Sequence, residues 1–140
     1  MGLLIILALF PVAWFLQNLI HEGSHLLVGW LVEGRKPTKM IPWPSIRSGR
    51  LYFGYYEMGK ATKRGSPLWR HVAPLFSSWI LMTIFIELLT STGNFMFAPF
   101  FICALVDYSV WMFGYIVEKD GTDGQAFSDL LDKPANNWRP

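Results

Sequence analysis

The chain has 140 residues, of which 52% are hydrophobic and 16% are aromatic, and its formal net charge is only +2. An apolar content this high is unusual for a soluble domain of this length. It indicates a small integral membrane protein built as one membrane domain over residues 1–140. The single cysteine, Cys103, excludes an internal disulfide framework and a zinc cluster of several thiolates.

The first predicted element is a long apolar helix over residues 3–32, interrupted by Pro11. A helix of this length measures about 45 Å and exceeds the hydrocarbon core of about 30 Å, so this span is expected to tilt or to project beyond the bilayer. No Lys or Arg precedes the apolar run and no small-residue cleavage site follows it. This favours a retained membrane span over a signal peptide.

Inside this helix the sequence His21-Glu22-Gly23-Ser24-His25 has the HExxH pattern. Residues four apart share one face of a helix, so His21 and His25 can direct two imidazoles at one metal ion. Glu22 can then act on a water molecule without being a ligand. Such a patch can also be a fortuitous cluster of polar core residues. Ionisable groups inside an apolar span are costly, however, and this context favours a hydrolytic zinc site.

A basic and aromatic loop is predicted over residues 33–70, which hold nine of the twelve Lys and Arg residues. Within it, residues 46–56 indicate a short β-hairpin that turns at Ser48-Gly49. The alternative is an irregular loop whose aromatic side chains lie at the membrane interface.

Two further apolar segments, residues 72–89 and 95–117, are the second and third predicted spans. Pro74 is expected in the first turn of the second span, where proline is tolerated. Residues 118–140 form a polar tail. The predicted fold is therefore an all-α polytopic membrane protein, with three transmembrane helices and a short β-hairpin or interfacial loop between the first two.

The charges predict the orientation of the three spans. The end of the first span and the end of the third span lie on the same membrane face, and all twelve Lys and Arg residues fall on that face. The positive-inside rule makes this face cytoplasmic and puts the N-terminus outside the cytoplasm. The HExxH segment is then expected to open toward the cytosol.

A hydrolytic zinc site needs a third protein ligand in addition to a position for water. Asp123 ranks first among the candidates, because the adjacent Gly124 allows a tight backbone turn. Asp107 is the alternative, since a carboxylate inside a membrane span requires a partner. Asp120 and His71 are further candidates, and His71 ranks third.

On these residues the chain resembles the site-2 protease family of intramembrane zinc metalloproteases. The HExxH at residues 21–25 matches the first core helix of the family, and Asp123-Gly124 is similar to its Asp-Gly element. Residues 72–78 look like the proline and small-residue motif that opens its second core helix. The predicted hairpin resembles the β element that follows its HExxH helix. The resemblance covers most of residues 10–131.

The resemblance implies a zinc metalloendopeptidase that cleaves a membrane-protein substrate by attack of a water molecule. The implied zinc ligands are His21, His25 and Asp123, and the implied catalytic base is Glu22. Zinc is the expected cofactor. The expected partners are a membrane-protein substrate and the lipid bilayer, without nucleic acid.

Three polar residues are candidate donors to the oxyanion that forms during hydrolysis: Asn18, one turn before His21, and Ser77 or Ser78 of the second predicted span. Two alternative functions remain open. One is a catalytically inactive protein of the same fold that binds a transmembrane partner. The other is a membrane zinc hydrolase that acts on another class of substrate, because HExxH specifies metal and base but not substrate.

Overall fold

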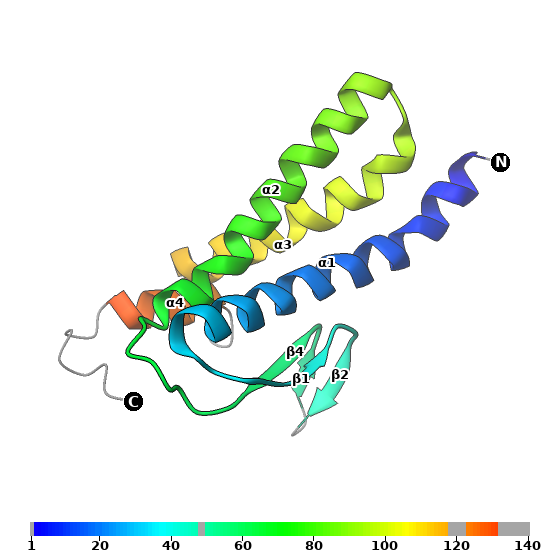
Figure 1. The fold of residues 1–140 in the computed structure, drawn as a ribbon. Helices are drawn as coiled ribbons and strands as arrows, with labels where there is room; N and C mark the ends of the chain where they lie inside the picture. The colour runs from blue at the N-terminus through cyan, green and yellow to red at the C-terminus, as the bar shows by residue number, and fades with distance from the viewer. Residues whose placement is uncertain (1, 48–49, 118–122, 132–140) are drawn as a thin grey trace.

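The computed structural model describes residues 2–47, 50–117 and 123–131 (Figure 1). Long helices account for most of these residues, and a small strand region lies between the first two helices. The elements in chain order are α1 (Gly2–Glu33), β1 (Pro37–Ile41), β2 (Ser45–Arg47), β3 (Arg50–Tyr52), β4 (Tyr55–Met58), α2 (Leu68–Thr92), η1 (Phe95–Phe97), α3 (Ala98–Val117) and α4 (Asp123–Leu131).

Three helical segments are long and apolar enough to cross a membrane: α1, α2, and η1 with α3. They confirm the three predicted spans and indicate a multi-pass membrane protein. The ends of these helices differ from the predicted ends. α2 extends beyond the predicted 72–89 at both ends and stops at Gly93, whose φ of 63° and N–H bond to the Leu89 carbonyl form a left-handed cap. The predicted span 95–117 is divided into a short 3₁₀ turn and α3.

The strand region contains two antiparallel pairs instead of one hairpin. β2 pairs with β3, as predicted for residues 46–56, while β1 pairs with β4 and was not predicted. The predicted turn at Ser48-Gly49 lies outside the described residues. Gly34, with a φ of 65°, ends α1 and turns the chain back, so that the strands lie beside the second half of this helix (Figure 1).

The buried face of α1 is mainly polar. Its buried residues are Ala13, Gln17, Asn18, Glu22, His25, Gly29 and Glu33. Large hydrophobic side chains of the same helix are exposed, such as those of Leu3, Leu4 and Trp30. This distribution fits a helix whose outer surface faces lipid while its polar groups find partners inside the protein.

Several helix ends gather at one end of the bundle. The C-terminal end of α1, the N-terminal end of α2, the C-terminal end of α3 and the short helix α4 lie together, and the chain's N-terminal end lies at the other end (Figure 1). α4 contacts both α2 and α3. The first residue of α4 is thereby brought to the polar face of α1.

Candidate metal centre

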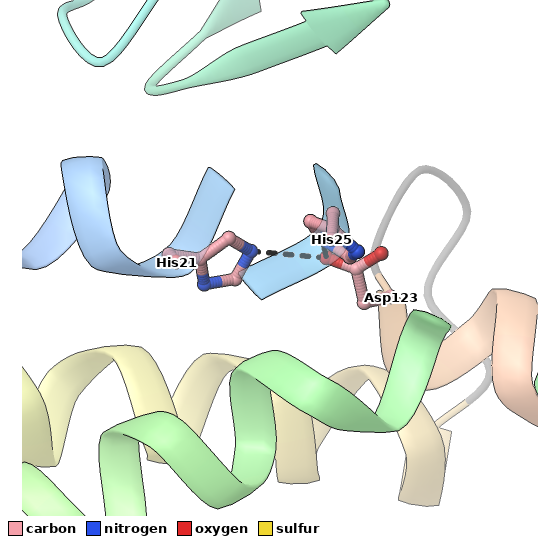
Figure 2. A group of neighbouring side chains, drawn as sticks. All are labelled: His21, His25 and Asp123. Atoms are coloured by element: carbon pink, nitrogen blue, oxygen red, sulfur yellow. Dashed lines mark hydrogen bonds and ion pairs between the residues drawn. The ribbon is translucent and has the colours of Figure 1, made fainter. Parts of the chain in front are cut away.

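Two histidines and one aspartate meet between α1 and α4 (Figure 2). The Nε2 atoms of His21 and His25 each lie 3.1 Å from the same Oδ2 atom of Asp123. The three ligand atoms all lie within 4.8 Å of one another. The structure therefore brings together the three residues that are predicted to hold zinc, two from one helix face and one from a segment far along the chain.

The outer nitrogen of each histidine, Nδ1, is the one that does not face Asp123, and it also has a partner. Nδ1 of His21 lies 2.9 Å from Oδ2 of Asp107, and Nδ1 of His25 lies 2.8 Å from the backbone carbonyl oxygen of Arg70. A carbonyl oxygen can only accept, so Nδ1 of His25 carries the hydrogen and donates it. Partners of this kind fix the tautomer and the orientation of metal-binding imidazoles.

The Arg70 carbonyl is available because of Pro74. In an α-helix this carbonyl would accept from the N–H of the residue four positions later, and proline has no N–H. The sequence had suggested that Pro74 lies in the first turn of this helix. This prediction was wrong, because α2 begins at Leu68 and Pro74 therefore lies inside the helix. The missing N–H leaves the Arg70 carbonyl free for the imidazole of His25.

Asp107, the alternative third ligand, occupies a different place. Its Oδ2 accepts from the side-chain amide of Gln17 at 3.0 Å and from the hydroxyl of Ser78 at 2.5 Å, and it also faces Nδ1 of His21. Asp107 thus contacts the ring nitrogen of His21 that does not face Asp123. This geometry favours Asp123 as the third ligand and makes Asp107 an outer partner that orients His21.

The hydrogen-bonding capacity of the cluster fits a bound cation. A neutral imidazole has one donor nitrogen and one acceptor nitrogen. His25 donates from Nδ1, so its neutral form presents an Nε2 lone pair to the Asp123 oxygen, which is also an acceptor. In a neutral His21 the hydrogen is held on Nδ1 by Asp107, and the Nε2 lone pair likewise faces Asp123. Two nitrogen lone pairs and one carboxylate oxygen directed at one another are a donor set suited to zinc.

Asp123 is held by the first turn of α4, where the helix dipole favours a carboxylate. Its Oδ1 lies 3.0 Å from Nδ1 of His71, so this third-ranked candidate orients Asp123. Burial raises the pKa of the Asp123 carboxyl, but its contacts with His25, His21 and His71 outweigh burial and hold the pKa well below its usual range. Asp123 is therefore a carboxylate at neutral pH. Asp120 lies outside the described residues.

Gly124 determines how closely α4 approaches α3. A Cβ atom at this position would collide with backbone atoms of Trp111 and Tyr115. The described glycines with positive φ are Gly34 and Gly93, so Gly124 does not form the tight turn that the sequence suggested. A close approach between two helix backbones explains the glycine here.

Gly124→Ala is expected to weaken zinc binding by about 10–100-fold, the range for losing support around a metal ligand. The new methyl group meets backbone atoms that cannot yield, so α4 must shift and carry Asp123 away from the histidines. Competition with a chromophoric chelator measures the Kd for zinc. The control is Gly23→Ala, where an added Cβ meets nothing within 4 Å, and it should bind zinc like the wild type. An unchanged Kd in Gly124→Ala would contradict this account.

Glu22 and two residues of the metal cluster line one cavity of about 590 Å³. His25, Asp123 and all four residues of β4 belong to its lining. The carboxyl group of Glu22 packs directly against Gly54, where any Cβ atom would collide with it. The predicted base therefore has a defined place beside the cluster and faces open space that a substrate can enter.

No protein-family model matches this chain, and no curated protein and no solved structure matches it. The interpretation of the metal centre rests on the residues and on their geometry.

Each of the three candidate oxyanion donors already donates a hydrogen bond to another group of the protein. The hydroxyl of Ser77 donates to a carbonyl of its own helix, and the hydroxyl of Ser78 donates to Asp107. The amide of Asn18 donates to the carbonyl of Phe53 at 3.0 Å. An amide group has two N–H donors, whereas a hydroxyl has one. Asn18 is therefore the candidate of the three that retains a second donor.

Three residues around the cluster were not predicted: Gln17, Arg70 and Tyr56. Gln17 lies one turn before His21 on the same helix face, so its position was a usable signal. The free carbonyl of Arg70 follows from Pro74 four residues later. Tyr56 stacks on the second histidine of the cluster, with ring centroids 4.4 Å apart. No local sequence pattern distinguished Tyr56 from the other aromatic residues of the loop as the one that contacts the cluster.

Proposed function

We propose that the chain is an intramembrane zinc endopeptidase, which cleaves a peptide bond in or near a transmembrane segment of a membrane-protein substrate. One observation carries the proposal: the Nε2 atoms of His21 and His25 converge on one oxygen of Asp123 within a bundle of membrane-length helices. Glu22 adjoins this cluster and opens into the same cavity. Two imidazoles, one carboxylate ligand and a separate carboxyl group are the residues that a hydrolytic zinc site requires.

Each residue has a distinct task in the proposed reaction. Zinc held by His21, His25 and Asp123 would supply the Lewis acidity that activates water at neutral pH and polarises the scissile carbonyl. Glu22 accepts a proton from the attacking water as the new C–O bond forms, and returns it to the leaving amine as the C–N bond breaks. The second amide N–H of Asn18 is a donor for the carbonyl oxygen under attack.

The shape of the cavity favours an extended peptide as the substrate. All four residues of β4 line it, a length of about 13 Å. The backbone groups of a helical transmembrane segment are bonded internally, so such a substrate must unwind before its carbonyl can be attacked. A wall formed by a strand and by aromatic side chains suits the unwound segment.

The distribution of positive charge supports a cytosolic site. All twelve Lys and Arg residues lie within residues 35–70 or 119–139. Residues 35–70 carry nine of them and join two of the helix ends that gather near the metal cluster (Figure 1). With the positive-inside rule, the N-terminus lies outside the cytoplasm and water reaches the cavity from the cytosolic side.

The proposal is tested with the full chain in liposomes and a panel of tagged single-span membrane proteins. Spans that contain Gly or Pro are expected to be cut, because these residues weaken the helix, whereas a polyleucine span should resist. Treatment with 1,10-phenanthroline should abolish cleavage, and zinc added in excess of the chelator should restore it. Mass spectrometry of the products locates the cut.

The same experiment separates the alternative functions. Cleavage that persists after complete removal of zinc would contradict the metal mechanism. Zinc binding without cleavage of any substrate in the panel would favour a partner-binding protein without activity, or a hydrolase that acts on another class of substrate.

A further inference from the structure

A buried ion pair joins the end of α1 to the start of α2. The side chain of Glu33 is almost fully buried, and its two oxygens accept from Nε of Arg70 at 2.9 Å and from Nε of Arg35 at 2.6 Å. A buried carboxylate is costly without such partners. The side chains of these residues have no task in the peptide cleavage described above, so their arrangement calls for another explanation.

Arg70 contacts the surroundings of His25 in two ways. Its backbone carbonyl accepts from Nδ1 of His25, and its Nη1 donates to the hydroxyl of Tyr56 at 3.0 Å. The Tyr56 ring stacks on the imidazole of His25, with an interplanar angle of 23°. His25 is thus held both at its outer nitrogen and on its ring face.

Gly29 makes this arrangement possible. It lies one turn after His25 and one turn before Glu33, so the three residues share one face of α1. A Cβ atom at Gly29 would lie 3.2 Å from Cδ of Arg70 and would overlap the side chain of Met58. The space left by the glycine lets the Arg70 side chain lie against α1 and reach Glu33.

The geometry points to a clamp, formed by Glu33, Arg70 and Tyr56, that positions His25 and thereby sets the affinity of the metal centre for zinc. Glu33 fixes the guanidinium group, the guanidinium group fixes the Tyr56 hydroxyl, and the Tyr56 ring fixes the plane of the imidazole. A ligand whose rotation is restricted in advance loses less entropy on binding the metal. This inference rests on the proposed zinc centre. The residues of the clamp do not bind the metal themselves but act through the ligand His25.

The clamp is tested by the Kd for zinc of the detergent-purified full chain, measured by competition with a chelator. Tyr56→Leu removes the stacked ring and should raise the Kd by about 10–100-fold, as expected for groups that orient a metal ligand. Tyr56→Phe keeps the ring and should restore most of the affinity. The visible absorption of the cobalt-substituted protein should change in Tyr56→Leu and return in Tyr56→Phe, because it reports the geometry of the ligands.

Tyr52→Leu is the matched control, because this ring also lines the cavity but contacts Tyr55 and not His25. It should leave the Kd and the cobalt spectrum unchanged. If Tyr56→Leu does not fold, Arg70→Lys replaces it, since a lysine can pair with Glu33 but lacks the fork that also holds the tyrosine hydroxyl. It should weaken zinc binding several-fold.

The possible outcomes separate the clamp from the proposed function. A folded wild-type protein that binds no zinc would overturn both. A wild type that binds zinc, with the same Kd and cobalt spectrum in the folded Tyr56→Leu or Arg70→Lys variant, would overturn the clamp and leave the zinc centre intact. Equal losses of affinity in Tyr52→Leu and Tyr56→Leu would also overturn the clamp, because the effect would then not depend on contact with His25.

Discussion

Replacing Glu22 by Gln is expected to lower the rate of peptide cleavage by about 10²–10⁴-fold without loss of zinc. The amide cannot accept a proton from the attacking water, but its size matches the carboxyl group that packs against Gly54. Glu22 is not one of the three residues whose ligand atoms converge, so about one zinc per chain should remain. The initial rate on a cleaved single-span protein in liposomes and the zinc content of the same sample measure both effects.

Glu87→Gln is the matched control for this change. Glu87 is exposed on α2, in the part of the helix that leads to Gly93, away from the metal cluster. The same exchange of carboxyl for amide should leave the rate and the zinc content unchanged there. If Glu22→Gln kept the wild-type rate with zinc bound, another group would have to be the base. If it lost zinc, Glu22 would be a ligand instead.

Replacing Asp123 by Ala is expected to abolish zinc binding at concentrations that saturate the wild type. Asp123 supplies the only carboxylate oxygen that both Nε2 atoms of the described cluster face, so the variant retains two imidazoles of a site that needs three protein ligands. Asp107→Ala should retain zinc with a Kd raised by about 10–100-fold, because it loses an outer partner of His21 and not a ligand.

The two aspartate variants are compared by chelator competition, with circular dichroism of the zinc-free proteins as the test of folding. The order of the two losses decides the assignment. A larger loss in Asp107→Ala than in Asp123→Ala would make Asp107 the third ligand. Wild-type affinity in both variants would contradict a zinc site at this cluster.

Local patterns were sufficient to predict much of the fold. Apolar segments of membrane length predicted three helices, and errors in their boundaries arose where polar residues such as Arg70 and His71 find partners inside the protein. The β2–β3 pair was predicted because its strands are adjacent in sequence. Strand β1 was not predicted, because its first residues, Pro37-Thr38-Lys39, show no alternation and its partner, β4, is separated from it by the inner pair.

Sequence by itself determined the helices and the shared face of the HExxH histidines, because both depend on residues within one or two turns of one another. Only the tertiary structure shows that Asp123, and not Asp107, faces the Nε2 atoms of both histidines. The packing of α4 on α3 brings Asp123, 102 positions from His21, to its Nε2 atom, and leaves Asp107 on Nδ1. The stacking of Tyr56 on His25 was decided in the same way. Such contacts depend on how separate segments pack together, and the periodicity of one segment carries no information about that.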